Sequence, residues 1–199
     1  MPPVERPIPM FAAEPPQEPL PYGRWAESLA ARFVAAARPA APGELGELSW
    51  YPERTLGGRT YVPASAPIAE GGEVCGYVSF RRADEGSQPD DFLADAYFTE
   101  DVADENPDWA LDLSDLEIGD WRGPDGRRGK LTLVWGAALV PNGAVATAEL
   151  GPTTTDQCEL VEERFTLVTL DAYTGDFLEV RLYGPRGMEL ARESLYEEE

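Results

Sequence analysis

Five oxygen-bearing side chains in the acidic stretch between residues 100 and 120 are spaced in a way that could bind a metal ion. If Asp104 is counted as position 1, Asn106, Asp108, Asp112 and Asp115 stand at positions 3, 5, 9 and 12. The calcium loop of an EF-hand takes ligands from these positions, because Ca²⁺ prefers oxygen donors. The spacing therefore indicates a candidate calcium site formed by these five residues.

The same stretch departs from the EF-hand pattern. Trp109 stands at position 6, where the sharp turn of such a loop requires glycine, and Pro107 stands at position 4. Position 12 is a short aspartate, and no amphipathic helix pattern flanks the stretch. The alternative interpretation is an acidic surface loop whose Trp109, Leu111 and Leu113 point inward.

The rest of the sequence offers little catalytic chemistry. Histidine is absent and Lys130 is the only lysine, so the commonest general base and the usual Schiff-base residue are missing or scarce. We find no P-loop, nucleophile-elbow, HExxH or GxGxxG motif. A glycoside hydrolase needs only two carboxylates, but the sequence does not indicate which two of the 37 acidic residues would pair.

Composition limits the partners. The formal net charge is −21, with 37 acidic residues against 16 basic ones, so we expect no nucleic acid and no anionic membrane as partner. A basic protein is a better match for this charge as a partner.

No run of about 18 apolar residues occurs, and the N-terminus does not have the pattern of a secretory signal, so we expect a cytoplasmic protein. The excess of arginine over lysine indicates a GC-rich bacterial genome.

The chain divides into an arm and a domain. Residues 1–22 form a proline-rich arm that favours an extended polyproline conformation. Its large apolar residues could dock on a partner or on the domain itself, and the candidates are Met10, Phe11, Leu20 and Tyr22. We expect residues 23–199 to form a single mainly β domain.

One helix is expected at the start of this domain. Trp25, Leu29, Phe33 and Ala36 recur at helical spacing within residues 24–37. Pro39 ends the pattern.

After residue 50 the apolar pattern changes to the alternation of β-strands. It predicts strands near residues 73–80, 92–99, 130–135, 144–150, 165–170, 177–183 and 188–196. Pro141-Asn142-Gly143 is typical of a tight reversal, so we expect strands 130–135 and 144–150 to form a hairpin with Trp135 over its small alanines. Residues 158–165 fit either a strand or a helical turn.

These elements predict an antiparallel β-sandwich or barrel with one N-terminal helix. The alternative is an α+β fold in which the helix packs on an antiparallel sheet. Cys75 and Cys158 are expected to be small buried residues, with a disulfide between them as the alternative. The expected core comprises Trp25, Phe33, Leu131, Leu133, Trp135, Phe165, Leu167, Val180 and Leu182.

The function that these observations favour is that of a soluble, acidic, non-enzymatic β-domain acting through protein–protein contact or self-association. No cofactor is expected apart from the calcium candidate. Two alternatives stay open: a carboxylate-only enzyme resembling a glycoside hydrolase, and a calcium- or carbohydrate-binding module.

Overall fold

The computed structural model describes residues 20–21, 23–81, 89–124, 126–171 and 178–195. Among them, one α-helix and one short 3₁₀ turn accompany a fold that is otherwise built of strands. The elements in chain order are α1 (Gly23–Ala37), β1 (Ser49–Trp50), β2 (Arg54–Leu56), β3 (Arg59–Pro67), β4 (Glu73–Arg81), β5 (Asp90–Thr99), η1 (Ala103–Glu105), β6 (Leu111–Arg122), β7 (Arg128–Ala138), β8 (Val145–Leu150), β9 (Thr153–Glu159), β10 (Arg164–Asp171), β11 (Leu178–Tyr183) and β12 (Glu189–Ser194).

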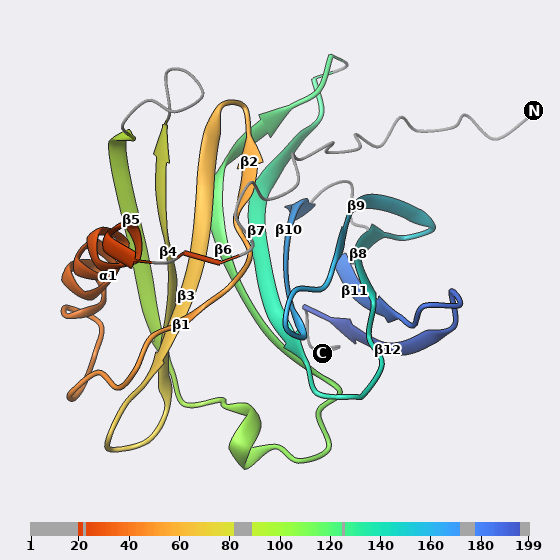
Figure 1. Cartoon of the computed structure of the whole chain (residues 1–199). Helices are drawn as coiled ribbons and strands as arrows, with labels where there is room; N and C mark the ends of the chain where they lie inside the picture. The colour runs from red at the N-terminus through yellow and green to blue at the C-terminus, as the bar shows by residue number, and fades with distance from the viewer. Residues whose placement is uncertain (1–19, 22, 82–88, 125, 172–177, 196–199) are drawn as a thin grey trace, which may run out of the picture.

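The strands form three antiparallel sheets that stack in layers (Figure 1). The first sheet has the order β1-β3-β4-β5, with β2 also paired to β3; the middle sheet is β10-β7-β6, and the third is β12-β11-β8-β9. Helix α1 covers the outer face of the first sheet. The expected fold, an antiparallel β-sandwich with one helix at the N-terminal end of the domain, is confirmed.

Strands β7 and β10 of the middle sheet are buried on both faces, whereas β6 has exposed positions. Because side chains alternate along a strand, β7 directs Leu133 and Trp135 toward the first sheet and Val134 toward the third. Strand β10 alternates in the same way. Three buried clusters result: Leu29, Phe33, Val62, Val74, Val78 and Phe80 under the helix; Tyr61, Tyr77, Leu133, Trp135 and Val168 between the first and middle sheets; and Val134, Phe165, Leu167, Leu178, Val180 and Leu182 between the middle and third sheets.

Helix α1 forms where the sequence predicts it. Leu29 and Phe33 are fully buried on the first sheet, and the Trp25 ring packs edge-on against Phe80 with 5.1 Å between ring centroids. Of the nine expected core residues, Trp25 and Leu131 are only partly buried and the other seven are buried.

Strand β3 escaped prediction because two prolines interrupt its sequence. Pro63 has no N–H to donate, and such a residue normally argues against an inner strand. Its carbonyl accepts a hydrogen bond from Tyr51 N on the side of β1 and β2. The ring nitrogen of Pro63, which cannot donate, faces the same side. Residue 63 lies between residues 64–65 of β3, which pair with β1, and residues 59–61, which pair with β2. The proline therefore removes no ladder hydrogen bond.

The expected hairpin between residues 130–135 and 144–150 is wrong. Strand β7 pairs with β6 at one edge and with β10 at the other, so neither edge is left for β8. Strand β8 pairs instead with β9 and β11 in the third sheet. Asn142 does adopt a positive φ of 67°, but the turn connects two layers. Trp135 consequently faces the first sheet, away from the alanines of β8.

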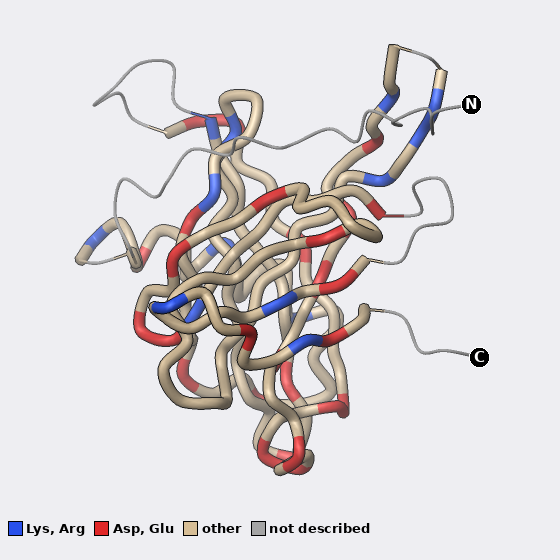
Figure 2. The backbone as a smooth tube through the Cα atoms, turned by 90° about the vertical axis from the view of Figure 1, so that its right-hand side faces the viewer, with Lys and Arg blue, Asp and Glu red and all other residues tan. Residues whose placement is uncertain are grey.

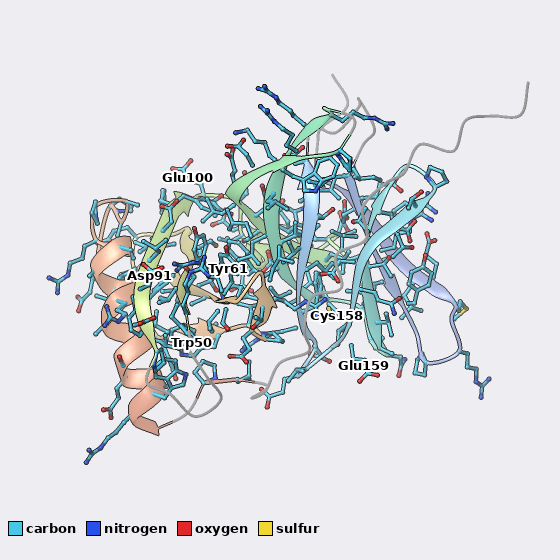
Figure 3. All side chains as sticks on the ribbon, turned by 90° about the horizontal axis from the view of Figure 1, so that it is seen from above. Trp50, Tyr61, Asp91, Glu100, Cys158 and Glu159 are labelled. Atoms are coloured by element: carbon cyan, nitrogen blue, oxygen red, sulfur yellow. The ribbon has the colours of Figure 1, made fainter. Side chains whose placement is uncertain are left out.

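Residues 158–165, which the sequence left ambiguous, form a tight β connection. Strand β9 ends at Glu159 and β10 begins at Arg164, and Glu162 and Glu163 both have positive φ. Cys75 and Cys158 are free thiols. They belong to different layers. Cys75 packs between the first and middle sheets, and Cys158, labelled in Figure 3, packs against the cluster between the middle and third sheets.

Two arginines tie the layers together. Arg54 of β2 donates from Nη2 to Asp156 Oδ1 of β9 over 2.6 Å, and both side chains are about 95% buried. The second oxygen of Asp156 accepts a hydrogen bond from Val168 N of β10. Arg164 of β10 donates to the carbonyl oxygen of Trp50 in β1 over 2.8 Å. The Arg54–Asp156 pair thus connects strands from all three sheets.

Removing one partner of this buried ion pair should destabilise the fold strongly. Arg54→Met leaves a buried carboxylate without its counter-charge, and we expect a loss of about 3–5 kcal/mol in the free energy of unfolding. The double variant Arg54→Met/Asp156→Asn should recover much of that loss, because no uncompensated charge remains and the amide oxygen can still accept the hydrogen bond from Val168 N. Urea unfolding of the three proteins measures both values, and a double variant no more stable than the single one would contradict the account.

Candidate functional site: an acidic cleft beside strand β6

The structure separates the five residues of the calcium candidate. Asp104 lies in η1, Asn106 and Asp108 lie in the turn that follows, and Asp112 and Asp115 lie in β6. Residues three apart in a strand point to opposite faces, so Asp112 and Asp115 cannot turn toward one ion from the same face. The described part of the chain contains no group of three or more His, Cys, Asp or Glu side chains arranged to hold a metal ion.

Of the four candidate anchor residues of the arm, the structure describes one. Met10, Phe11 and Tyr22 lie outside the described residues, and Leu20 is partly buried ahead of α1.

No helix in the described ranges is long and apolar enough to cross a membrane.

Three of the calcium candidates nevertheless line one cleft. It has a volume of about 550 Å³ and lies along the first residues of β6, at the lower end of the molecule in Figure 1. Among the described strands, β6 pairs with β7 alone, so its outer edge is open to this cleft. The lining comes from all three sheets and from the loop before β6: Glu73, Cys75, Tyr97, Thr99, Asp101, Asn106, Trp109, Leu111, Asp112, Leu113, Ser114, Asp115, Glu193, Ser194 and Leu195.

Two carboxylates approach each other across the space between the first and middle sheets. Glu73 stands on the same face of β4 as the buried Cys75, with 3.8 Å between Glu73 Oε2 and Cys75 Sγ. Asp112 stands on the same face of β6 as Ser114, whose cross-strand partner Trp135 faces the first sheet. Burial, together with the charges of Glu73 and Asp104, raises the pKa of Asp112 to about 6.

The uncharged groups of the cleft remain protonated at neutral pH. Burial, with a smaller contribution from Glu73, raises the pKa of the Cys75 thiol to about 12, so this cysteine is not an activated nucleophile. Burial also raises the pKa of Tyr97. The same cause raises the pKa of Tyr51, whose hydroxyl lies 3.4 Å from Ser65 Oγ behind the cleft. These phenols are neutral hydrogen-bonding groups.

The charge of the cleft has one sign. Its charged lining residues are Glu73, Asp101, Asp112, Asp115 and Glu193, and no lysine or arginine is among the described residues that line it. The rings of Tyr97 and Trp109 complete the wall. Carboxylates and aromatic faces both attract cations, so the arrangement suits a positively charged group.

The sequence could indicate only part of this site. Asp112 was singled out from its acidic surroundings, but Glu73, Tyr97 and Glu193 come from three other strands, and the fold alone brings them together. One signal in the sequence could have indicated Glu73. It directly precedes the mostly apolar stretch Val74 to Phe80, and a charged residue at the start of a buried strand is expected at the open end of a layer.

Comparison with known proteins gives no relative. No family model matches the chain, and none of the curated proteins or solved structures compared with it is significantly similar.

The raised pKa of Asp112 predicts a pH-dependent stability effect. The folded state holds this proton up to about pH 6, whereas an unfolded aspartic acid releases it near pH 4. The carboxylate therefore destabilises the fold above pH 6, and the penalty vanishes near pH 4. We expect Asp112→Asn to raise the free energy of unfolding by about 1–3 kcal/mol at pH 7.5 and by almost nothing at pH 4.

Denaturant unfolding at the two pH values measures the effect. Asp108→Asn serves as the matched control, because Asp108 is exposed in the adjacent turn and outside the cleft lining. A stabilisation by Asp112→Asn that is equal at both pH values would show that the cause is not the charge.

Proposed function

We propose that the chain is a non-enzymatic binding module whose acidic cleft takes up a cationic side chain of a protein partner. The observation that carries the proposal is that the charged side chains of the cleft lining are all acidic. Five carboxylates, and no lysine or arginine among the described residues, surround a cavity of about 550 Å³. The cytoplasmic location and the bacterial source stay predictions from the sequence.

The chemistry of the cleft favours an arginine or lysine over a neutral group. A guanidinium can form charge-assisted hydrogen bonds to a carboxylate, and these are stronger than bonds between neutral partners. Burial near Asp112 weakens the competition from water. Tyr97 and Trp109 offer ring faces to the aliphatic stem or to the cation itself. A bound cation would also remove the repulsion between Glu73 and Asp112, because it lowers the pKa of the carboxyl groups beside it.

A short arginine peptide tests this function. We expect an acetylated, amidated Gly-Arg-Gly-Arg-Gly peptide to bind the full-length chain in isothermal titration calorimetry at low salt, and its citrulline counterpart to bind at least about tenfold more weakly. Affinity should be higher at pH 7.5 than at pH 5, because protonation of Asp112 competes with the cation. Added salt should weaken it.

The double variant Glu73→Gln/Asp112→Asn should lose this binding. Glu27→Gln/Glu162→Gln removes the same amount of charge from exposed positions outside the cleft lining and should keep it. Equal loss in both double variants would mean that the peptide senses only net charge, and the proposed function would fail.

One observation favours a second candidate function, the hydrolysis of glycosides. Burial and neighbouring charges raise the pKa of Asp112 to about 6, and one of these charges is that of a second carboxylate, Glu73; two carboxyl groups, one of them with a raised pKa, are the pair that such chemistry uses. In that case nitrophenyl glycosides should be cleaved, and Asp112→Asn should reduce turnover by about 10²–10⁴-fold. Absence of turnover by the unmodified chain across α- and β-linked substrates would reject this candidate.

A further inference from the structure

The end of the β6–β7 hairpin carries two exposed arginines of like charge side by side. Arg122 and Arg128 are cross-strand partners in the register of the hairpin, and both are exposed. Neither makes an ion pair within the described part of the chain, whereas Lys130 lower in the hairpin pairs with Glu117 and Asp120. Like charges directly opposite each other in an antiparallel pair repel, and among the described residues the charge of Asp120 acts on Arg128 without forming an ion pair with it.

This hairpin end also projects from the sheet. Among the described residues the pairing of β7 with β10 stops at Lys130, and Figure 1 shows the end of the β6–β7 hairpin extending above the rest of the middle sheet. Arg127 lies in the same segment and is partly buried. The hairpin tip, defined here as the described residues 122–124 and 126–128, is therefore a narrow basic projection on an acidic protein.

The hairpin tip and the acidic cleft lie at opposite ends of one strand. The cleft contacts β6 at residues 111–115, and the strand ends at Arg122. At about 3.3 Å per residue, 11 steps separate the two ends by roughly 36 Å. In Figure 2 the blue segments of this hairpin lie at the upper right, and a group of red segments lies at the lower end of the molecule.

From this arrangement we infer that the partner of the acidic cleft is a second copy of the chain, whose hairpin tip enters the cleft with Arg122 and Arg128 toward Glu73 and Asp112. The inference rests on the proposed function and names its cation. The two surfaces complement each other in charge and in form, since a narrow basic projection meets an acidic recess. Docking also pairs both sets of like charges that repel each other in the single chain.

The symmetry of such a contact determines how copies assemble. Two different surfaces meet, so the interface is heterologous, and each copy that uses its tip still has a free cleft. The expected product is a head-to-tail series of copies that lengthens with concentration, until it closes into a ring if the geometry allows.

Sedimentation of complementary variants tests the assembly. The full-length chain at low ionic strength should sediment with a weight-average mass at least about twice its 21.8 kDa. The tip variant Arg122→Gln/Arg128→Gln and the cleft variant Glu73→Gln/Asp112→Asn should each sediment as monomers. Mixed together they should form a 1:1 dimer that does not grow, because only one tip and one cleft are intact. The matched control Arg24→Gln/Arg186→Gln, which changes two exposed arginines elsewhere, should assemble as the parent does.

The outcomes separate this inference from the proposed function. A parent chain that stays monomeric at low salt, or a mixture that forms no dimer, overturns the inference. If the arginine peptide still binds the cleft in that case, the proposed function stands and the partner is another basic protein. If the peptide also fails to bind, both are rejected. Loss of assembly in the Arg24/Arg186 control would mean that net charge, not the hairpin tip, drives association.

Discussion

The burial of strands β7 and β10 of the middle sheet on both faces determines the rest of the architecture. These two strands must carry apolar residues at successive positions, as in Leu133-Val134-Trp135, because each face lies against another sheet. Two kinds of place then accommodate charged side chains. Glu73 and Asp112 lie at an open end of a layer, whereas Arg54 and Asp156 form a buried pair in which the charges compensate each other. The cleft is thus the point where the double-sided packing ends.

The sequence predicted those features of the fold that depend on residues close together in the chain. The alternation of Val74, Cys75 and Tyr77 assigned both faces of β4, and Leu29 and Phe33 assigned the buried side of α1. Pairing partners are not local. The turn at Asn142 was recognisable, but that it joins two sheets depends on β10 occupying the edge of β7, and no residue near the turn encodes this. Strand β6 was hidden because its exposed positions are acidic, which is also typical of a loop.

The cleft illustrates the same limit for function. A sequence pattern drew attention to Asp112 as one of five calcium ligands, whereas the fold places it opposite Glu73 on another sheet. Spacing along the chain predicts neighbours within one element, but the groups around this cleft meet across three sheets. The destabilising proximity of its carboxylates has no role in packing, and residues that weaken a fold locally are expected where a ligand compensates them.

The ion pair that links the layers has a consequence for the order of folding. Arg54 and Asp156 are 102 residues apart in the chain. Their ion pair between the first and third sheets therefore cannot form until about three quarters of the chain has been synthesised. The loop closed by this contact is long, and contacts of high sequence separation form late because their entropy must be lost first. Strand β7, which covers the inner face of the first sheet with Leu133 and Trp135, precedes Asp156 in the chain. The first and middle sheets can therefore pack together while Arg54 still lacks its counter-charge, and the joining of the third sheet supplies it.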